Sequence, residues 1–194
     1  MPLFSRQELS AKGSSVERNI YKSAGIILKE STLKFSSDTI YQIFLSHSYQ
    51  DAVIILGLSQ IIEEMGFSVY VDWLEDTQLD RANVTPDTAG LLRERMKNCQ
   101  SLFYAVSTNS SGSVWMPWEL GYFDGLKGKV AIIPIVESSI VTEYYDGREY
   151  LGLYPYVTKT NDSNGKPTLW INKSPDNYVS LTRWLKGQPF RIHK

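Results

Sequence analysis

The chain has 194 residues, of which 42% are hydrophobic, 12% aromatic and 21% charged, so a disordered chain is excluded. This length fits one domain of about 150 residues with some forty left for an extension, which excludes a multidomain machine. Twenty basic and 21 acidic residues give a net charge of −1. No basic field exists to neutralise phosphates, so nucleic acid is not an expected partner.

The cysteine content argues against disulfides and metal sites. Cys99 is the one cysteine, and no CxxC motif or Cys/His cluster occurs, so we expect no bound metal. The longest apolar stretches, 52–58 and 130–136, are far shorter than the roughly 20 residues of a membrane helix. The first 15 residues lack the apolar segment of a secretory signal. We therefore expect a cytoplasmic protein with no membrane partner.

Residues 1–38 are polar and serine-rich apart from a few apolar residues at three- and four-residue spacing. These are Val16, Ile20, Ala24, Ile27 and Leu28. The spacing predicts one amphipathic helix, so residues 1–38 are expected to form an N-terminal helical extension. Such a helix covers one edge of the domain or grips a partner.

Beyond Asp38, short β-branched and aromatic runs alternate with helical stretches, which predicts βαβ units and a parallel sheet of about five strands. The expected strands are Tyr41–Ser46, Phe67–Trp73, Ser101–Ser107, Lys129–Val136 and a less marked Leu151–Val157. The expected helices are Ala52–Met65, Pro86–Asn98 and Pro117–Leu126. An α/β core over residues 39–160 follows.

The ends of these helices carry local signals. Gly66 and Gly128 are expected to stop two of them, and Thr85 is expected to cap the helix that begins at Pro86. In the remaining 161–194 region, residues 161–167 predict an exposed turn. A last helix near Asn177–Leu185 is expected to pack Leu181 and Trp184 on the core.

Ligands of open parallel sheets bind at the carboxyl ends of the strands, and here the residues after three strands are polar. The segments are 46–51, 72–76 and 107–111. Neither GxGxxG, a P-loop nor GxSxG is present, which disfavours a dehydrogenase, a P-loop ATPase and a serine hydrolase. His47 is either a group of the cleft or a loop histidine that bonds the backbone.

Glu119 is the most informative residue of the third predicted helix. With Pro117 as the first helical residue, Glu119 lies in the middle of an apolar stripe. One explanation is local, because an acid in the first turn favours the helix dipole. The other is a carboxylate aimed at the cleft. Trp115, four residues earlier, and Trp73 are each either core residues or stacking surfaces for a flat ligand.

Three segments carry a family resemblance: YQIFLSHSYQD at 41–51, the segment ending in VDW at Trp73, and SVWMPWE at 113–119. In this order they resemble a bacterial Toll/interleukin-1 receptor (TIR) domain over residues 39–157. The resemblance implies a flavodoxin-like fold and cleavage of NAD+ at the nicotinamide–ribose bond. Some bacterial TIR proteins of Thoeris antiphage systems make a cyclic ADP-ribose isomer that activates an effector.

The resemblance also implies roles for individual residues. Glu119 matches the catalytic glutamate. The implied substrate-binding residues are Phe44, Leu45, Ser46, His47, Asp72, Trp73, Ser113 and Trp115. NAD+ is then a substrate, with no permanently bound cofactor. The loop 74–84 lacks the proline-glycine pair of many receptor TIR domains, so receptor-type loop docking does not carry over.

Three functions stay open at this point. The first is an NAD+-cleaving enzyme of antiphage immunity that releases ADP-ribose or a cyclic isomer, with a downstream effector and TIR–TIR self-assembly as implied partners. The second is a non-enzymatic adaptor that signals by TIR–TIR assembly. The third is an enzyme like the nucleoside deoxyribosyltransferases, which also direct a glutamate at a ribosyl carbon.

Overall fold

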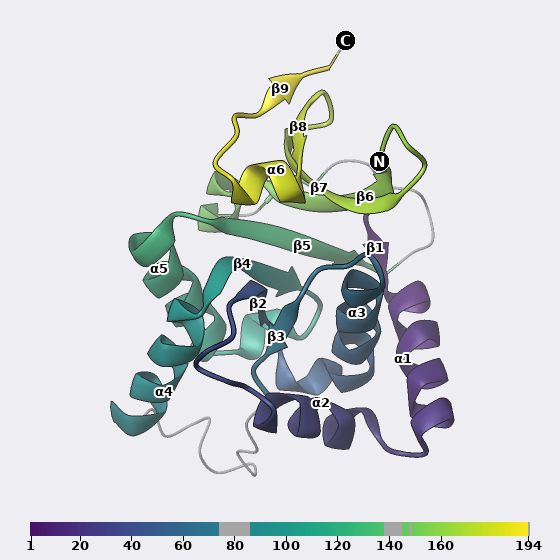
Figure 1. Ribbon diagram of the computed structural model, residues 1–194, viewed down its shortest axis with the longest axis vertical. Helices are drawn as coiled ribbons and strands as arrows, with labels where there is room; N and C mark the ends of the chain where they lie inside the picture. The colour runs from purple at the N-terminus through teal and green to yellow at the C-terminus, as the bar shows by residue number, and fades with distance from the viewer. Residues whose placement is uncertain (74–85, 138–144, 148, 194) are drawn as a thin grey trace.

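The computed structural model describes residues 1–73, 86–137, 145–147 and 149–193, and the strands within them form one sheet (Figure 1). The strands are β1 (Phe4–Ser5), β2 (Tyr41–Ser46), β3 (Val69–Val71), β4 (Cys99–Val106), β5 (Val130–Val136), β6 (Tyr156–Asn161), β7 (Pro167–Ser174), β8 (Asn177–Ser180) and β9 (Arg191–Ile192). The helices are α1 (Arg6–Ile20), α2 (Ala24–Leu33), α3 (Ala52–Glu64), α4 (Pro86–Lys97), α5 (Trp115–Lys127) and α6 (Leu181–Leu185). Short 3-10 helices span Tyr49–Asp51, Ser110–Gly112 and Glu149–Leu153.

The strand order is β3-β2-β4-β5-β6-β7-β8-β9, with β1 beside the end of β5. The pairs from β3 to β6 are parallel. Counted along the chain from β2, these five strands have the order 2-1-3-4-5 of flavodoxin-like folds. The predicted α/β fold with a central parallel sheet is confirmed.

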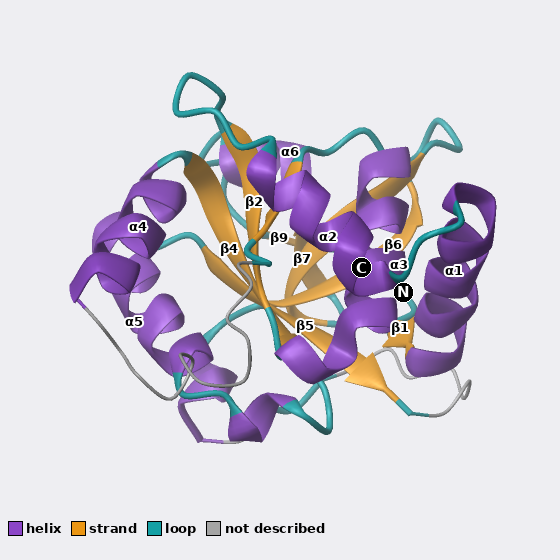
Figure 2. Ribbon diagram, turned by 90° about the horizontal axis from the view of Figure 1, so that it is seen from below, coloured by secondary structure: helices purple, strands orange, loops and turns teal. Residues whose placement is uncertain are grey.

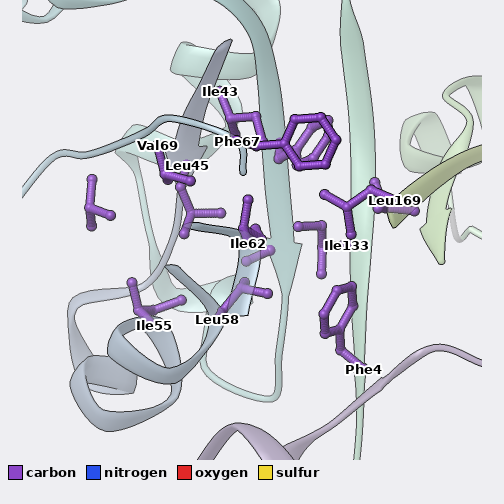
Figure 3. Packing of buried hydrophobic residues seen from close by; sticks show 14 of the residues in the cluster. Phe4, Ile43, Leu45, Ile55, Leu58, Ile62, Phe67, Val69, Ile133 and Leu169 are labelled. Atoms are coloured by element: carbon purple, nitrogen blue, oxygen red, sulfur yellow. The ribbon is translucent and has the colours of Figure 1, made fainter. Parts of the chain in front are cut away.

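Helices cover both faces of the parallel part of the sheet. Figure 2 shows α4 and α5 on one side and α1 and α3 on the other. Alternate residues of each strand enter different cores because successive side chains of a strand point to opposite faces. Leu45 packs in the core beneath α1, α2 and α3, as Figure 3 shows, whereas Phe44 packs in the core beneath α4 and α5.

The predicted single N-terminal helix is wrong, because two helices and a short strand occupy this region. Helix α1 ends at Tyr21, whose φ of 58° is left-handed, and α2 begins after Ser23. The three- and four-residue spacing of apolar residues continues from α1 into α2, so the sequence pattern does not indicate the break between them. Ala24 is buried on α2, whereas Ile20 at the end of α1 is 47% exposed.

Helix α1 packs directly on α3 through glycines. A Cβ at Gly57 would lie 2.0 Å from the carbonyl oxygen of Leu9, and one at Gly13 would lie 2.0 Å from that of Val53. Both distances are shorter than any van der Waals contact, so the close approach of the two helices requires glycine at both positions. The N-terminal helix is thus a packed part of the fold.

The C-terminal region differs from the prediction in its strands. Instead of a helix over Asn177–Leu185, β8 is followed by the short α6. With β7 and β9, β8 extends the sheet in antiparallel fashion beyond β6, at the top of Figure 1. Leu181 and Trp184 are buried, as predicted. The turn over 161–167 is also confirmed, since Asp162 accepts backbone hydrogen bonds from Asn164 and Lys166.

Most other boundaries agree with the prediction. The strand predicted over Leu151–Val157 begins later than expected. Glu149–Leu153 is a 3-10 helix with Leu153 80% exposed, and β6 begins at Tyr156. Gly66 and Gly128 have positive φ after α3 and α5, which confirms them as helix stops. Pro86 is the first residue of α4, and Thr85 lies outside the described residues. None of the helices described is both long and apolar enough to cross a membrane.

Candidate functional site

The position of Glu119 in its helix differs from the prediction. Helix α5 begins at Trp115, so Pro117 is its third residue and Glu119 its fifth. The first four N–H groups of a helix have no partner inside it, and a proline there costs no hydrogen bond. The first turn of α5 carries no acid, so the helix-dipole explanation for Glu119 is wrong.

Glu119 is instead explained by a partner on the sheet. Its side chain is buried, at 6% exposed, and its Oε2 accepts a hydrogen bond of 2.5 Å from Ser46 Oγ. Ser46 is the last residue of β2 and is 1% exposed. A buried carboxylate is costly unless it is hydrogen-bonded, and a hydroxyl donor to an ionised group makes a strong bond. The pair joins α5 to the carboxyl end of β2.

Tyr104 completes this group. It lies on β4 directly beside Ser46 in the parallel register, and it is 4% exposed. Burial raises the pKa of the Tyr104 hydroxyl far above its usual value, and a hydrogen bond with Tyr150 and the nearby charge of Glu119 raise it further. Tyr104 is therefore neutral and keeps its proton at physiological pH. Nothing in the sequence pattern distinguishes Tyr104 from the aromatic residues of the core.

A pocket of about 540 Å³ opens next to this group, at the carboxyl end of β4. Tyr104 and Pro117 lie in its wall together with serines 107, 110, 111 and 113. The opposite wall comes from the segment before β6, with Tyr145, Asp146, Glu149 and Tyr150. Pockets of this size hold small molecules, and this one lies where flavodoxin-like folds bind ligands.

Asp51 fixes the loop that forms the floor of the pocket. It is 3% exposed, and its carboxylate accepts hydrogen bonds of 2.5 Å from Ser107 Oγ and 2.7 Å from Asn109 Nδ2. Arg6 of α1 lies 3.9 Å from the same carboxylate. Asp51 thus connects the loop after β2, the loop after β4 and the N-terminal helix. The one feature of the sequence that indicates such a role for Asp51 is its position in the polar segment after the first predicted strand.

The structure separates His47 and Trp73 from the Glu119 group. His47 Nδ1 is hydrogen-bonded to the carbonyl oxygen of Leu45 at 2.9 Å, so the backbone-bonded alternative for this histidine is observed. Its ring stacks on Trp73, with centroids 5.2 Å apart. Trp73 is 2% exposed in the core beneath α2, and its backbone N–H donates to Thr32 Oγ1. Residues 74–76 lie outside the described residues.

The other predicted site residues lie around these two groups. Phe44 and Trp115 pack in the same core as Tyr104, and Trp115 meets Trp118 edge to face at 5.4 Å. Leu45 is fully buried in the opposite core. Asp72 is buried and accepts a hydrogen bond of 3.0 Å from the hydroxyl of Tyr70.

Two features complete the geometry of the site. Ser113 lines the pocket, and its Oγ accepts from the backbone N–H of Met116 at the start of α5. Within the described ranges, no three His, Cys, Asp or Glu side chains are grouped closely enough to hold a metal ion.

Comparison with known proteins identifies two relatives in bacilli and one in an archaeon, while no family model matches the chain. The "Probable 3' cyclic ADP-D-ribose synthase ThsB'" of Bacillus cereus is 49% identical over 192 residues, which are 96% of this chain and 99% of that protein. The "Putative cyclic ADP-D-ribose synthase TIR2" of Cytobacillus dafuensis is 31% identical over 84 residues, 43% of this chain and 22% of that protein.

A third relative, a MEMO1 family protein of Pyrobaculum arsenaticum, is 28% identical over 171 residues, which are 82% of this chain and 59% of that protein. Its identity is well below that of the Bacillus cereus protein, which matches from end to end. The near-complete match, the flavodoxin-like strand order and the TIR motifs agree with one another. The chain belongs to the TIR family of cyclic ADP-D-ribose synthases that includes ThsB'.

Proposed function

We propose that this chain cleaves NAD+ between nicotinamide and ribose and closes the product to a cyclic ADP-ribose in antiphage signalling. The observation that carries the proposal is the buried carboxylate of Glu119, held by Ser46 at the carboxyl edge of the sheet beside a pocket. The 49% identity to a protein named as a 3' cyclic ADP-D-ribose synthase supports the same reaction.

The chemistry needs one well-placed negative charge. When the C–N bond breaks, nicotinamide leaves with the electron pair as a neutral molecule, and positive charge develops on the ribose. A fixed carboxylate in a site of low dielectric stabilises that charge without reorganisation. Glu119 supplies it, and Ser46 positions it. Water attacking the anomeric carbon gives ADP-ribose, whereas a hydroxyl of the same molecule gives a cyclic product lighter by one water, and each reaction releases one proton.

The remaining site residues have supporting roles in this proposal. Trp115 and Phe44 form the apolar base beneath Glu119, and Ser113 faces the substrate from the pocket wall. Leu45, His47 and Trp73 are proposed to act from the other face of the sheet by fixing the end of β2. Asp72 is proposed to act through its hydrogen bond with Tyr70, which packs in the same core as Phe44. Residues 39–160 carry the chemistry, and residues 1–38 and 161–194 support it.

Partners and location belong to the same proposal. NAD+ is the substrate, and a separate effector that senses the cyclic product is the downstream partner. Such an enzyme acts in the cytoplasm, where NAD+ is available. Self-assembly through TIR–TIR contacts is proposed to increase the activity, so the assay below uses concentrated protein.

The decisive experiment compares the wild-type protein with Glu119→Gln and with Glu94→Gln, an exposed glutamate on α4. Each is incubated with NAD+, and nicotinamide and nucleotide products are separated by chromatography and mass spectrometry. We expect nicotinamide release and a cyclic product from the wild type and from Glu94→Gln, and at least ~100-fold less from a folded Glu119→Gln. Undiminished activity in Glu119→Gln rejects the assignment. A wild type that never releases nicotinamide favours the non-enzymatic adaptor.

A further inference from the structure

Of the residues assigned to the bond-breaking chemistry described above, Ser113 alone lines the pocket beside Glu119. The residues that act on that bond, Glu119 and Ser46, are not among those that line it. Tyr104 connects the two, because it lines the pocket and lies directly beside Ser46 in the sheet, and Ser46 donates to Glu119. A molecule in the pocket would therefore lie next to the reacting ribose without occupying its place.

The lining of the pocket combines three kinds of chemical group. Hydroxyls come from the serines of the loop after β4, carboxylates and aromatic rings from the segment before β6. Representative residues are Ser107, Ser111, Tyr145, Asp146, Glu149 and Tyr150. Carboxylates and hydroxyls accept hydrogen bonds from sugar hydroxyls and amino groups, and tyrosine rings pack against a flat base.

The wall that contains residues 145–147 and 149–151 has an unusual backbone. Glu149 has a φ of 51°, a left-handed conformation that is rare for residues other than glycine. A Cβ at Gly147 would lie 2.6 Å from the backbone nitrogen of Gly152, so this segment folds back on itself without room for a side chain there. Strain of this kind is found at ligand sites, where the surrounding structure holds it in place.

We propose that this pocket binds the adenosine half of NAD+, folded back beside the nicotinamide half. The proposal rests on the proposed function. Ring closure requires an adenosine hydroxyl within bonding distance of the anomeric carbon at Glu119, so the adenosine has to be held nearby. Its oxygen forms the new bond as nicotinamide leaves with the electrons of the old one, and the hydroxyl proton passes to solvent. A pocket that adjoins Glu119 through Tyr104, and whose lining offers hydroxyls, carboxylates and aromatic rings, meets this requirement.

A comparison of two substrates distinguishes binding of the adenosine half from binding of the nicotinamide half. NAD+ has both nucleosides, whereas nicotinamide mononucleotide has the same scissile bond and no adenosine. The test variant is Ser111→Phe, which places a ring in the pocket from an exposed position, and the matched control is Ser37→Phe, at an exposed serine before β2. We expect Ser111→Phe to lower kcat/KM for NAD+ at least ~10-fold, mainly through KM, but to lower that for the mononucleotide less than ~3-fold.

Equal losses with both substrates would overturn the proposal, because the pocket would then hold the nicotinamide half. No loss with NAD+ in a folded Ser111→Phe would overturn it too, since the pocket would be unused. Tyr150→Phe, which removes only a hydroxyl, is expected to raise the ratio of linear ADP-ribose to cyclic product. An unchanged ratio counts against the pocket as the place of ring closure.

A wild type that releases no nicotinamide would reject the proposed function and not the pocket. Calorimetric titration with adenosine then tests the pocket alone. Adenosine binding that is retained in Ser37→Phe and lost in Ser111→Phe supports the site. Absence of binding to the wild type overturns it.

Discussion

Ser46→Ala tests whether the position of Glu119 depends on its hydrogen bond to β2. The substitution removes one oxygen atom from a residue that is 1% exposed, and with it the donor 2.5 Å from Glu119 Oε2. The carboxylate stays buried and loses a fixed partner. We expect cleavage of NAD+ to slow because Glu119 no longer lies rigidly where positive charge develops on the ribose.

The size of the effect follows from the kind of bond. Hydrogen bonds to charged groups contribute roughly 1.5 to 3 kcal/mol. If this is lost in the transition state, kcat falls by roughly 10- to 100-fold, because each 1.36 kcal/mol corresponds to about tenfold in rate. The KM for NAD+ should change much less, since Ser46 acts through Glu119.

The matched control is Ser59→Ala. Ser59 is also a buried serine, at 6% exposed, and its Oγ donates to the carbonyl oxygen of Leu56 on α3 at 3.0 Å. Both variants lose one buried hydroxyl, so both should unfold at slightly lower urea concentration. Steady-state nicotinamide release should fall in Ser46→Ala alone. Full kcat in a folded Ser46→Ala, or the same loss in Ser59→Ala, would refute the role assigned to this bond.

Two further predictions concern stability and reactivity. Gly57→Ala should lower the free energy of unfolding by more than ~2 kcal/mol, because its Cβ would lie 2.0 Å from a backbone oxygen of α1. The control is Gly121→Ala on α5, where an added Cβ meets nothing within 4 Å, and it should raise the free energy of unfolding by about 0.5 to 1 kcal/mol. If Gly57→Ala and Gly121→Ala had similar effects in urea unfolding, the close packing of α1 on α3 would be contradicted. Burial raises the pKa of the Cys99 thiol to about 12, so it should react with a thiol reagent at neutral pH far more slowly in the native protein than in urea. Equal labelling rates, followed by absorbance, would show that Cys99 is not buried in the native protein.

The parallel core was predictable because its signals are local. Each strand from β2 to β5 is a run of apolar residues, and glycines or prolines mark several helix ends. The break between α1 and α2 has no such signal. Tyr21 adopts a left-handed conformation that tyrosine rarely takes, and there the backbone N–H groups of Tyr21 and Lys22 both donate to the carbonyl oxygen of Glu17. The antiparallel strands β7 and β8 were missed because the helical interpretation of 177–185 took in the whole of β8.

The site was predictable in part. Glu119 was singled out because an acid in an apolar stripe requires an explanation, and the catalytic role predicted for it came from the TIR resemblance. Its partner Ser46 is 73 positions away in the chain, so the register of the sheet, and not the sequence, brings the two together. Tyr104 lies in a buried strand, where an aromatic residue that lines a pocket has the same sequence pattern as a core residue. Asp51 is one polar residue among several in its loop, and only its contacts distinguish it.

The end of β2 shows why a continuous motif does not make a continuous site. Leu45, Ser46 and His47 are consecutive, but the pleat of the strand sends alternate side chains to opposite faces. Ser46 therefore reaches Glu119 on α5, whereas His47 stacks on Trp73 beneath α2. The proposed catalytic pair thus lies on the α5 face of the sheet, and the His47–Trp73 stack attaches the N-terminal helices to the strand that carries Ser46. The contacts from α2 to Trp73, from Trp73 to His47 and from Ser46 to Glu119 form a continuous series through the end of β2, so a change in the packing of α2 is expected to alter the position of Glu119.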